Sequence, residues 1–203
     1  MNKRFRNMAT AKQFTGALFI IAFLVACNSA YTPKRKGYFS IEFPEKQYRS
    51  FNEPGYPYSF EYPVYANIVK DTMFFGDKAE DYWINIDVPR LGGRIYISYK
   101  PVNDTNFYSL VEDAYKMSHK QHIDVSTGIE QTVLKTPNGI EGIYYSLQGN
   151  TATANQFFLT DSTKHFLRGA LYFDATPNED SLNIVNDFLK KDVYHLINTL
   201  KWK

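Results

Sequence analysis

The chain has a single cysteine, Cys27, which ends a short apolar segment that follows a basic N-terminus. Residues 1–12 carry basic side chains and no acidic one, and residues 16–26 are uncharged and mostly apolar. A basic start followed by an apolar run of roughly 7–15 residues is typical of a secretory signal peptide. The run is too short to span a bilayer, which needs roughly 20 residues of helix. We therefore expect the folded domain to be built only by the chain that follows this segment.

The ending Leu24-Val25-Ala26-Cys27 resembles the bacterial lipobox, in which the cysteine is acylated and a signal peptidase cuts before it. This resemblance implies a mature chain that begins at lipidated Cys27, with membrane lipid as a partner and the protein anchored rather than spanning. The alternative is an ordinary secreted protein with a chance cysteine. On the first interpretation, residues 1–26 are a lipoprotein signal peptide, 27–37 a tether and 38–203 a single domain.

Loss of the signal peptide changes the charge and the chemistry of the chain. It removes four positive charges (Lys3, Arg4, Arg6 and Lys12) and no negative charge, so the formal net charge falls from +2 to −2. Nucleic acid is therefore not an expected partner, because such binding relies on a basic surface. With Cys27 acylated, the mature chain has no thiol for a disulfide, a nucleophile or a metal site.

Residue periodicity predicts strands and two helices. Strands are expected at 38–43, at 56–64, in a hairpin of 84–88 and 95–99, and at 130–135, 142–148, 156–160 and 165–173. Apolar residues at three- and four-residue steps predict one helix from Phe107 to about Ser118 and another from Leu182 to Leu200. We expect an α+β domain, an antiparallel sheet packed by helices. Its element order resembles the Mog1/PsbP-like sandwich, an analogy that carries no chemistry.

The histidines do not form a recognisable catalytic or metal motif. His119 and His122 are three residues apart near a helix end, where histidines are commonly solvated, and they lack the spacing of zinc proteases. No Gly-x-Ser-x-Gly motif accompanies His165, although a Ser–His–acid triad stays open because its members are distant in sequence. We expect no catalytic residue, no metal site and no cofactor.

Two features are candidates for binding a partner. Tyr56, Tyr58, Phe60 and Tyr62 alternate, so their rings share one face of an extended segment. Pro57 and Pro63 cannot donate to a ladder, so this strand should lie at a sheet edge or be interrupted. The rings either pack between sheet and helices or are exposed to bind, and the binding alternatives are stacking on sugars and a protein interface. Arg168 interrupts an apolar strand, and we expect it to be a structural arginine with a partner, a ligand clamp being the alternative.

Several stretches together resemble the GldD family of gliding-motility lipoproteins. They are YTPKRKGYFSIEFPEKQY, PYSFEYPVYANI, PRLGGRIYISYKPV and QFFLTDSTKHFLRGALYFDATPNEDSL, and the resemblance runs from the lipobox to the C-terminus. It implies a role in gliding and in the linked type IX secretion apparatus, with other subunits as partners. Only Cys27 takes a definite role from the family.

Two classes of function stay open. The first is a non-catalytic lipoprotein that assembles or stabilises other motility subunits, and the second is a periplasmic ligand-binding protein or cell-wall-active enzyme. Acidic residues after the lipid cysteine direct some lipoproteins of gliding bacteria to the cell surface, whereas this tether carries Lys34, Arg35 and Lys36. We therefore expect a periplasm-facing protein, on either the inner or the outer membrane.

Overall fold

The computed structural model describes residues 41–203 except 72, 75–76, 79 and 121. The expected signal peptide, Cys27 and the tether lie outside the described residues. The elements in chain order are β1 (Tyr48–Phe51), β2 (Tyr58–Pro63), β3 (Asn67–Lys70), β4 (Met73–Phe74), β5 (Asp77–Lys78), β6 (Ile84–Val88), the 3-10 turn η1 (Pro89–Leu91), β7 (Gly93–Pro101), α2 (Phe107–His119), β8 (Ser126–Lys135), β9 (Glu141–Gly149), β10 (Asn155–Thr160), β11 (His165–Phe173), α3 (Glu179–Thr199) and β12 (Lys201–Trp202).

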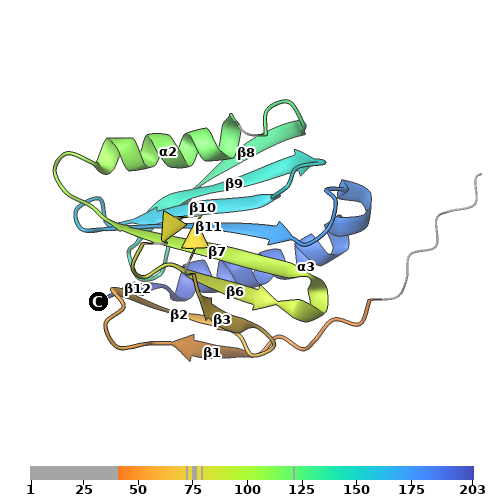
Figure 1. The fold of residues 1–203 in the computed structure, drawn as a ribbon, viewed down its shortest axis with the longest axis horizontal. Coiled ribbons are helices and arrows are strands. Elements are labelled where there is room, and N and C mark those ends of the chain that lie inside the picture. The colour runs from red at the N-terminus through yellow and green to blue at the C-terminus, as the bar shows by residue number, and fades with distance from the viewer. Residues whose placement is uncertain (1–40, 72, 75–76, 79, 121) are drawn as a thin grey trace, which may run out of the picture. The chain divides into compact units, whose positions relative to one another are not determined.

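The domain is built on a seven-stranded antiparallel sheet in the order β3-β6-β7-β11-β10-β9-β8 (Figure 1). One face packs against α3 and a three-stranded sheet, β1-β2-β12, in a core that includes Ile95, Leu171 and Leu189. The other face packs in part against α2, through a smaller cluster that includes Leu110 and Phe158. The expected α+β class, an antiparallel sheet packed by helices, is confirmed.

Most local predictions are confirmed. Strands β6 and β7 form the expected hairpin, in which Ile84 pairs with Ile97, and Gly92 takes the left-handed conformation (φ 60°) at the turn. Strand pairs β8–β9 and β10–β11 lie where alternation predicted them. Helix α3 begins after Asn178, whose side chain accepts a hydrogen bond from the backbone N–H of Ser181.

The strand expected at 38–43 is not found in its described part, because residues 41–43 belong to no strand. The first strand begins later, at Tyr48. Phe43 instead stacks on Phe188 of α3, with ring centroids 4.4 Å apart. The apolar pattern of this segment therefore reflects packing on a helix rather than pairing in a sheet.

Pro57 and Pro63 were expected to place their strand at an edge or to interrupt it, and the edge position is wrong. β2 is the central strand of the three-stranded sheet, between β1 and β12. Pro57 lies before the strand, and Pro63 is its last residue. β12 pairs only with Tyr58 and Ser59 of β2. The hydrogen bonds between β2 and β12 therefore end well before Pro63, which has no backbone N–H to donate.

Candidate functional site

Three of the four aromatic residues that are candidates for binding a partner are core residues. Tyr58, Phe60 and Tyr62 do share one face of β2, but that face points inward, and their exposed fractions are 0%, 2% and 9%. They pack with rings of both sheets, and the centroids of Tyr58 and Tyr99 are 5.8 Å apart. Their alternation therefore records packing between layers, and as described they offer no surface to a partner.

Tyr56 is the member of this group that keeps partial exposure. Its ring contacts Phe51, Tyr58 and Tyr82 edge-on, at centroid distances of 5.1 to 5.7 Å. It also lines a shallow hollow with Lys70. A binding role for this aromatic segment can thus apply to Tyr56, and it stays a prediction.

The structure separates His119 from His122. His119 stacks on Tyr115 at 4.0 Å, and its Nε2 accepts a hydrogen bond from Gln131 Nε2 at 3.0 Å. His122 is buried after the end of α2, where burial, followed by the charge of Arg168, lowers the pKa of its imidazole. Within the described part of the chain, no group of three His, Cys, Asp or Glu side chains is placed to hold a metal ion.

His165 makes the contacts that come nearest to a catalytic relay. Its Nδ1 lies 2.9 Å from the hydroxyl of Tyr99, and its ring stacks on Trp202 at 4.9 Å. Asp161 is 3.9 Å from His165 Nε2, beyond hydrogen-bond distance. Although burial acts to raise the pKa of Asp161, hydrogen bonds from the backbone N–H groups of residues 163–165 lower it. Asp161 therefore serves the β10–β11 turn, and Tyr99 is buried.

Arg168 lies on β11, on the face of the large sheet that α2 partly covers. Its guanidinium donates a hydrogen bond to the side-chain oxygen of Gln156, and Tyr172 is a further hydrogen-bonding neighbour. Burial lowers the pKa of the guanidinium, an effect that Tyr172 partly offsets. The described side-chain acceptor of Arg168 is thus a neutral amide, and the choice between a structural arginine and a ligand clamp stays a prediction.

A buried ionic cluster centred on Asp192 of α3 was not predicted from the sequence. Asp192 is 1% exposed, and its carboxylate lies 2.7 Å from Lys46 Nζ. It accepts hydrogen bonds from the hydroxyls of Tyr48 and Tyr65. Lys46 Nζ also donates to the carbonyl oxygen of Phe188 and lies over its ring. The signal in the sequence is an acid next to Val193 on the apolar stripe of a helix, where only a paired carboxylate is tolerated.

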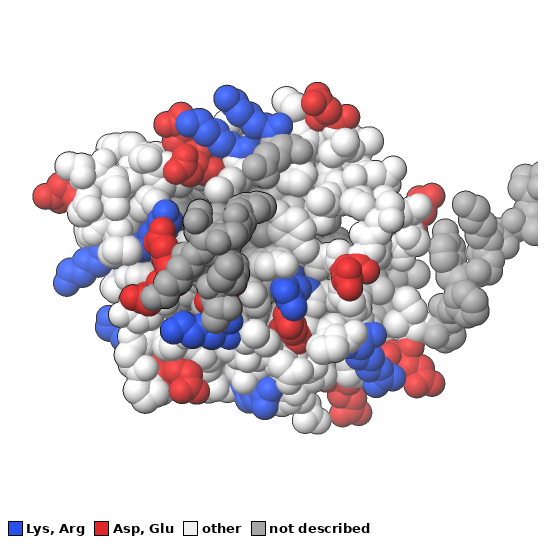
Figure 2. Space-filling view, viewed as in Figure 1, with Lys and Arg blue, Asp and Glu red and all other residues white. Residues whose placement is uncertain are grey.

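The described surface includes a modest cavity and has a mixed charge distribution. A cavity of about 120 Å³ lies between the start of α3 and the β9–β10 turn, lined by amide side chains such as Gln148, Asn183 and Asn186. On the face in Figure 2, basic and acidic side chains are interspersed. Neither described helix is long and apolar enough to cross a membrane.

The chain was compared with known families, curated proteins and solved structures. The family model described as "Gliding motility lipoprotein GldD" matches residues 28–202. No curated protein matches. Among solved structures, the chain is similar to the solution structure of cyanobacterial PsbP (CyanoP) from Synechocystis sp. PCC 6803, with 8% identity, a TM-score of 0.45, and coverage of 79% of this chain and 95% of that one.

Proposed function

The chain belongs to the gliding motility lipoprotein GldD family, and from this premise we propose that it is a lipid-anchored, non-catalytic component of the gliding machinery. In this proposal it assembles or stabilises other motility subunits and supports the linked type IX secretion apparatus. The observation that carries the proposal is the extent of the family match, which begins one residue after Cys27 and ends one residue before the C-terminus. Acylated Cys27 holds the domain on a membrane, facing the periplasm.

The contacts of the described residues support a role in assembly rather than in chemistry. The Tyr99–His165 pair is covered by Trp202, and its acid is engaged by backbone N–H groups. Aromatic surface is available elsewhere, since Tyr108 and Tyr115 lie seven residues apart on α2 and are 84% and 47% exposed. Exposed tyrosines are frequent anchors of protein interfaces.

The test compares loss of the anchor with loss of the histidines. Cys27→Ser should give an unlipidated protein that folds but no longer supports gliding, because it is not concentrated beside its partners. His165→Gln, which can still accept a hydrogen bond from Tyr99, and His119→Gln should retain gliding. Motility is scored together with protein abundance and far-UV circular dichroism.

The second candidate, a cell-wall-active enzyme, predicts the opposite ranking. If His165→Gln abolishes gliding while the protein stays folded and abundant, the non-catalytic proposal is wrong. If cells that carry Cys27→Ser glide normally, the function does not depend on the lipid anchor.

A further inference from the structure

Arg168 is a largely buried cation with no described counter-ion. Among the described residues no carboxylate lies within ion-pair distance of its guanidinium. Arg94, on the adjacent strand β7, shows the contrast, because both oxygens of Asp87 accept hydrogen bonds from it. Burial of a charge without an opposite charge is unfavourable. Arg94 therefore has a carboxylate partner, whereas Arg168, on the same face of the sheet, has none among the described residues.

Gln156 points to the same deficit. Its Oε1 accepts hydrogen bonds from Arg168 Nη2 and, at 3.3 Å, from Ser118 Oγ. Because the guanidinium can only donate, the amide oxygen must face it, and the NH₂ group must face away. Gln156 is fully buried, and its Nε2 has no hydrogen-bond partner in the described structure. Buried donors are almost always satisfied, and Gln156 Nε2 is a donor for which the described residues supply no acceptor.

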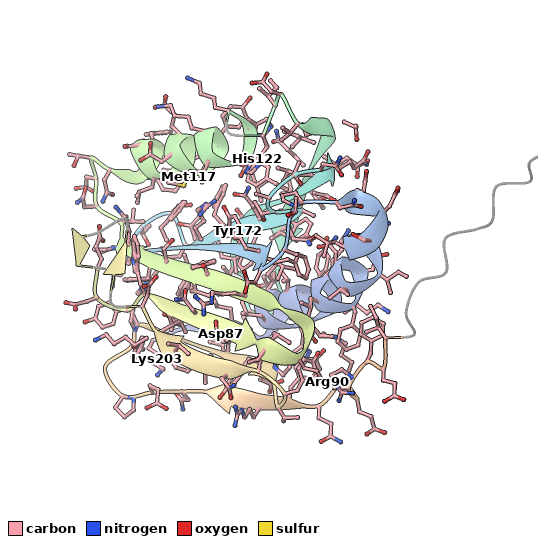
Figure 3. The ribbon with its side chains drawn as sticks, turned by 45° about the vertical axis from the view of Figure 1, so that its right-hand side comes forward. Asp87, Arg90, Met117, His122, Tyr172 and Lys203 are labelled. Atoms are coloured by element: carbon pink, nitrogen blue, oxygen red, sulfur yellow. The ribbon has the colours of Figure 1, made fainter. Side chains whose placement is uncertain are left out.

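The surrounding residues leave part of Arg168 accessible to solvent, whereas Gln156 is buried beside it. On β11 the same face carries Arg168, Ala170 and Tyr172, and Tyr96 of β7 pairs with Ala170. Tyr96 is 39% exposed and contacts Tyr172 edge-on at 5.5 Å, and Arg168 itself is partly exposed. Tyr172 and His122 are labelled in Figure 3, where the sheet face extends beyond α2. Arg168 is therefore the member of the pair that a ligand would meet first, beside these two tyrosines.

We propose that Arg168 and Gln156 form a binding site for a carboxylate, one oxygen accepting from the guanidinium and the other from Gln156 Nε2. His122, 5% exposed and with an unpartnered Nε2, borders the site. Burial and the charge of Arg168 lower the pKa of His122, so its imidazole is neutral at neutral pH. One cation beside neutral groups matches a planar monoanion better than a phosphate, which is bulkier and more highly charged. The carboxylate comes from a small molecule or from an acidic side chain of a partner protein.

The site can be tested directly on the purified lipoprotein in detergent micelles. Sodium acetate is titrated at constant ionic strength, with chloride as the balancing anion, while the ¹⁵N-labelled side-chain amide of Gln156 is followed by NMR. We expect a saturable shift with a Kd in the range of roughly 1–10 mM, as suits a ligand of a few atoms. Phosphate should bind more weakly. If a blocked Gly-Glu-Gly peptide binds more tightly than acetate, the site is assigned to an acidic side chain of a protein. If acetate binds as tightly as the peptide or more tightly, the site is assigned to a small carboxylate.

Three variants separate this site from a packing role. Arg168→Lys should weaken acetate binding about tenfold or more, because an ammonium cannot replace the planar guanidinium. Gln156→Glu places a carboxylate beside Arg168, so it should abolish acetate binding. Because this variant lacks the Gln156 amide, its binding is monitored through the NMR signal of Arg168 Nε–H. The variant should also have a higher urea midpoint than the wild type when both are measured without acetate. Arg94→Lys, on the same face but already paired with Asp87, should bind acetate as the wild type does.

Two results would overturn the inference: the absence of a saturable shift in the wild type, or a shift that persists in both Arg168→Lys and Gln156→Glu. Destabilisation by Gln156→Glu would also count against it, since a cation that lacks a counter-ion should accept one. The acetate titration requires no motility subunit. Its failure is therefore distinguishable from failure of the proposed assembly role, which is decided by Cys27→Ser.

Discussion

Asp192 is the residue through which the segment entering the domain is held on α3. Lys46, Tyr48 and Tyr65 all direct polar atoms at its carboxylate, and Asp192 itself is buried. Burial lowers the pKa of Lys46, an effect opposed by the Asp192 carboxylate. Removal of one member of such a cluster leaves the others buried and unpaired, which costs more than the interaction itself contributes.

Asp192→Ala should therefore lower the free energy of unfolding by about 3–5 kcal/mol. The matched control is Asp187→Ala on the same helix, where the side chain is exposed and a change within about 0.5 kcal/mol is expected. Urea unfolding followed by far-UV circular dichroism measures both variants. Equal stability of the two would show that the cluster does not hold the segment.

At the scale of elements, α3 packs with both the seven-stranded and the three-stranded sheet. Leu189 and Leu196 are 0% and 1% exposed in the main core, as the helical period predicted. Leu→Ala at either position should cost about 2–5 kcal/mol, through lost burial and the cavity left behind. Ile184→Ala, which changes a side chain of α3 that is 51% exposed, is the control for helix propensity. The measurement is the urea midpoint of each variant. If the two core variants have the same midpoint as Ile184→Ala, the proposed packing of α3 is contradicted.

The sequence predicted those elements whose periodicity is local. The hairpin at Gly92 and both helices were found because their signals lie within a short window. β12 was missed because two residues carry no period and its partner Tyr58 is distant in the chain. The same limit applies to the candidate sites. Alternation placed Tyr58 and Phe60 on one face without saying that another layer covers it, and Arg168 was noticed while its contact across strands was not.

At the scale of the whole molecule, tyrosine rings connect the layers. The ring of Tyr58 on β2 contacts the ring of Tyr99 on β7. The Tyr58 hydroxyl donates a hydrogen bond to the carbonyl oxygen of Tyr82. Tyr144 of β9 stacks on Tyr194 of α3 at 4.8 Å. Because many of these phenols are buried or bonded to acceptors, the charged phenolate form is unfavourable in the folded state. The stability of the fold as a whole is therefore linked to tyrosine ionisation.

This linkage predicts alkaline unfolding. Burial, as the first cause in each case, raises the pKa of the described residues Tyr48, Tyr56, Tyr58, Tyr65, Tyr99, Tyr144, Tyr145 and Tyr194. In the unfolded chain tyrosine ionises near pH 10. Because the folded pKa values are higher, their contribution to stability is fully present below about pH 10 and is lost as the pH rises above it. The lowered pKa of Lys46 acts in the opposite sense, but it is one group against several.

We therefore expect the protein to unfold in one step above about pH 10, with tyrosinate absorbance at 295 nm rising as the far-UV circular dichroism signal is lost. Below that pH the urea midpoint should not fall through tyrosine ionisation. Protein kept unfolded in urea is the control, and its absorbance should rise gradually around pH 10 because every phenol is solvated. A folded sample that follows the same gradual curve with unchanged circular dichroism would show that the tyrosines are free to ionise in place, and that the layers do not depend on their burial as neutral groups.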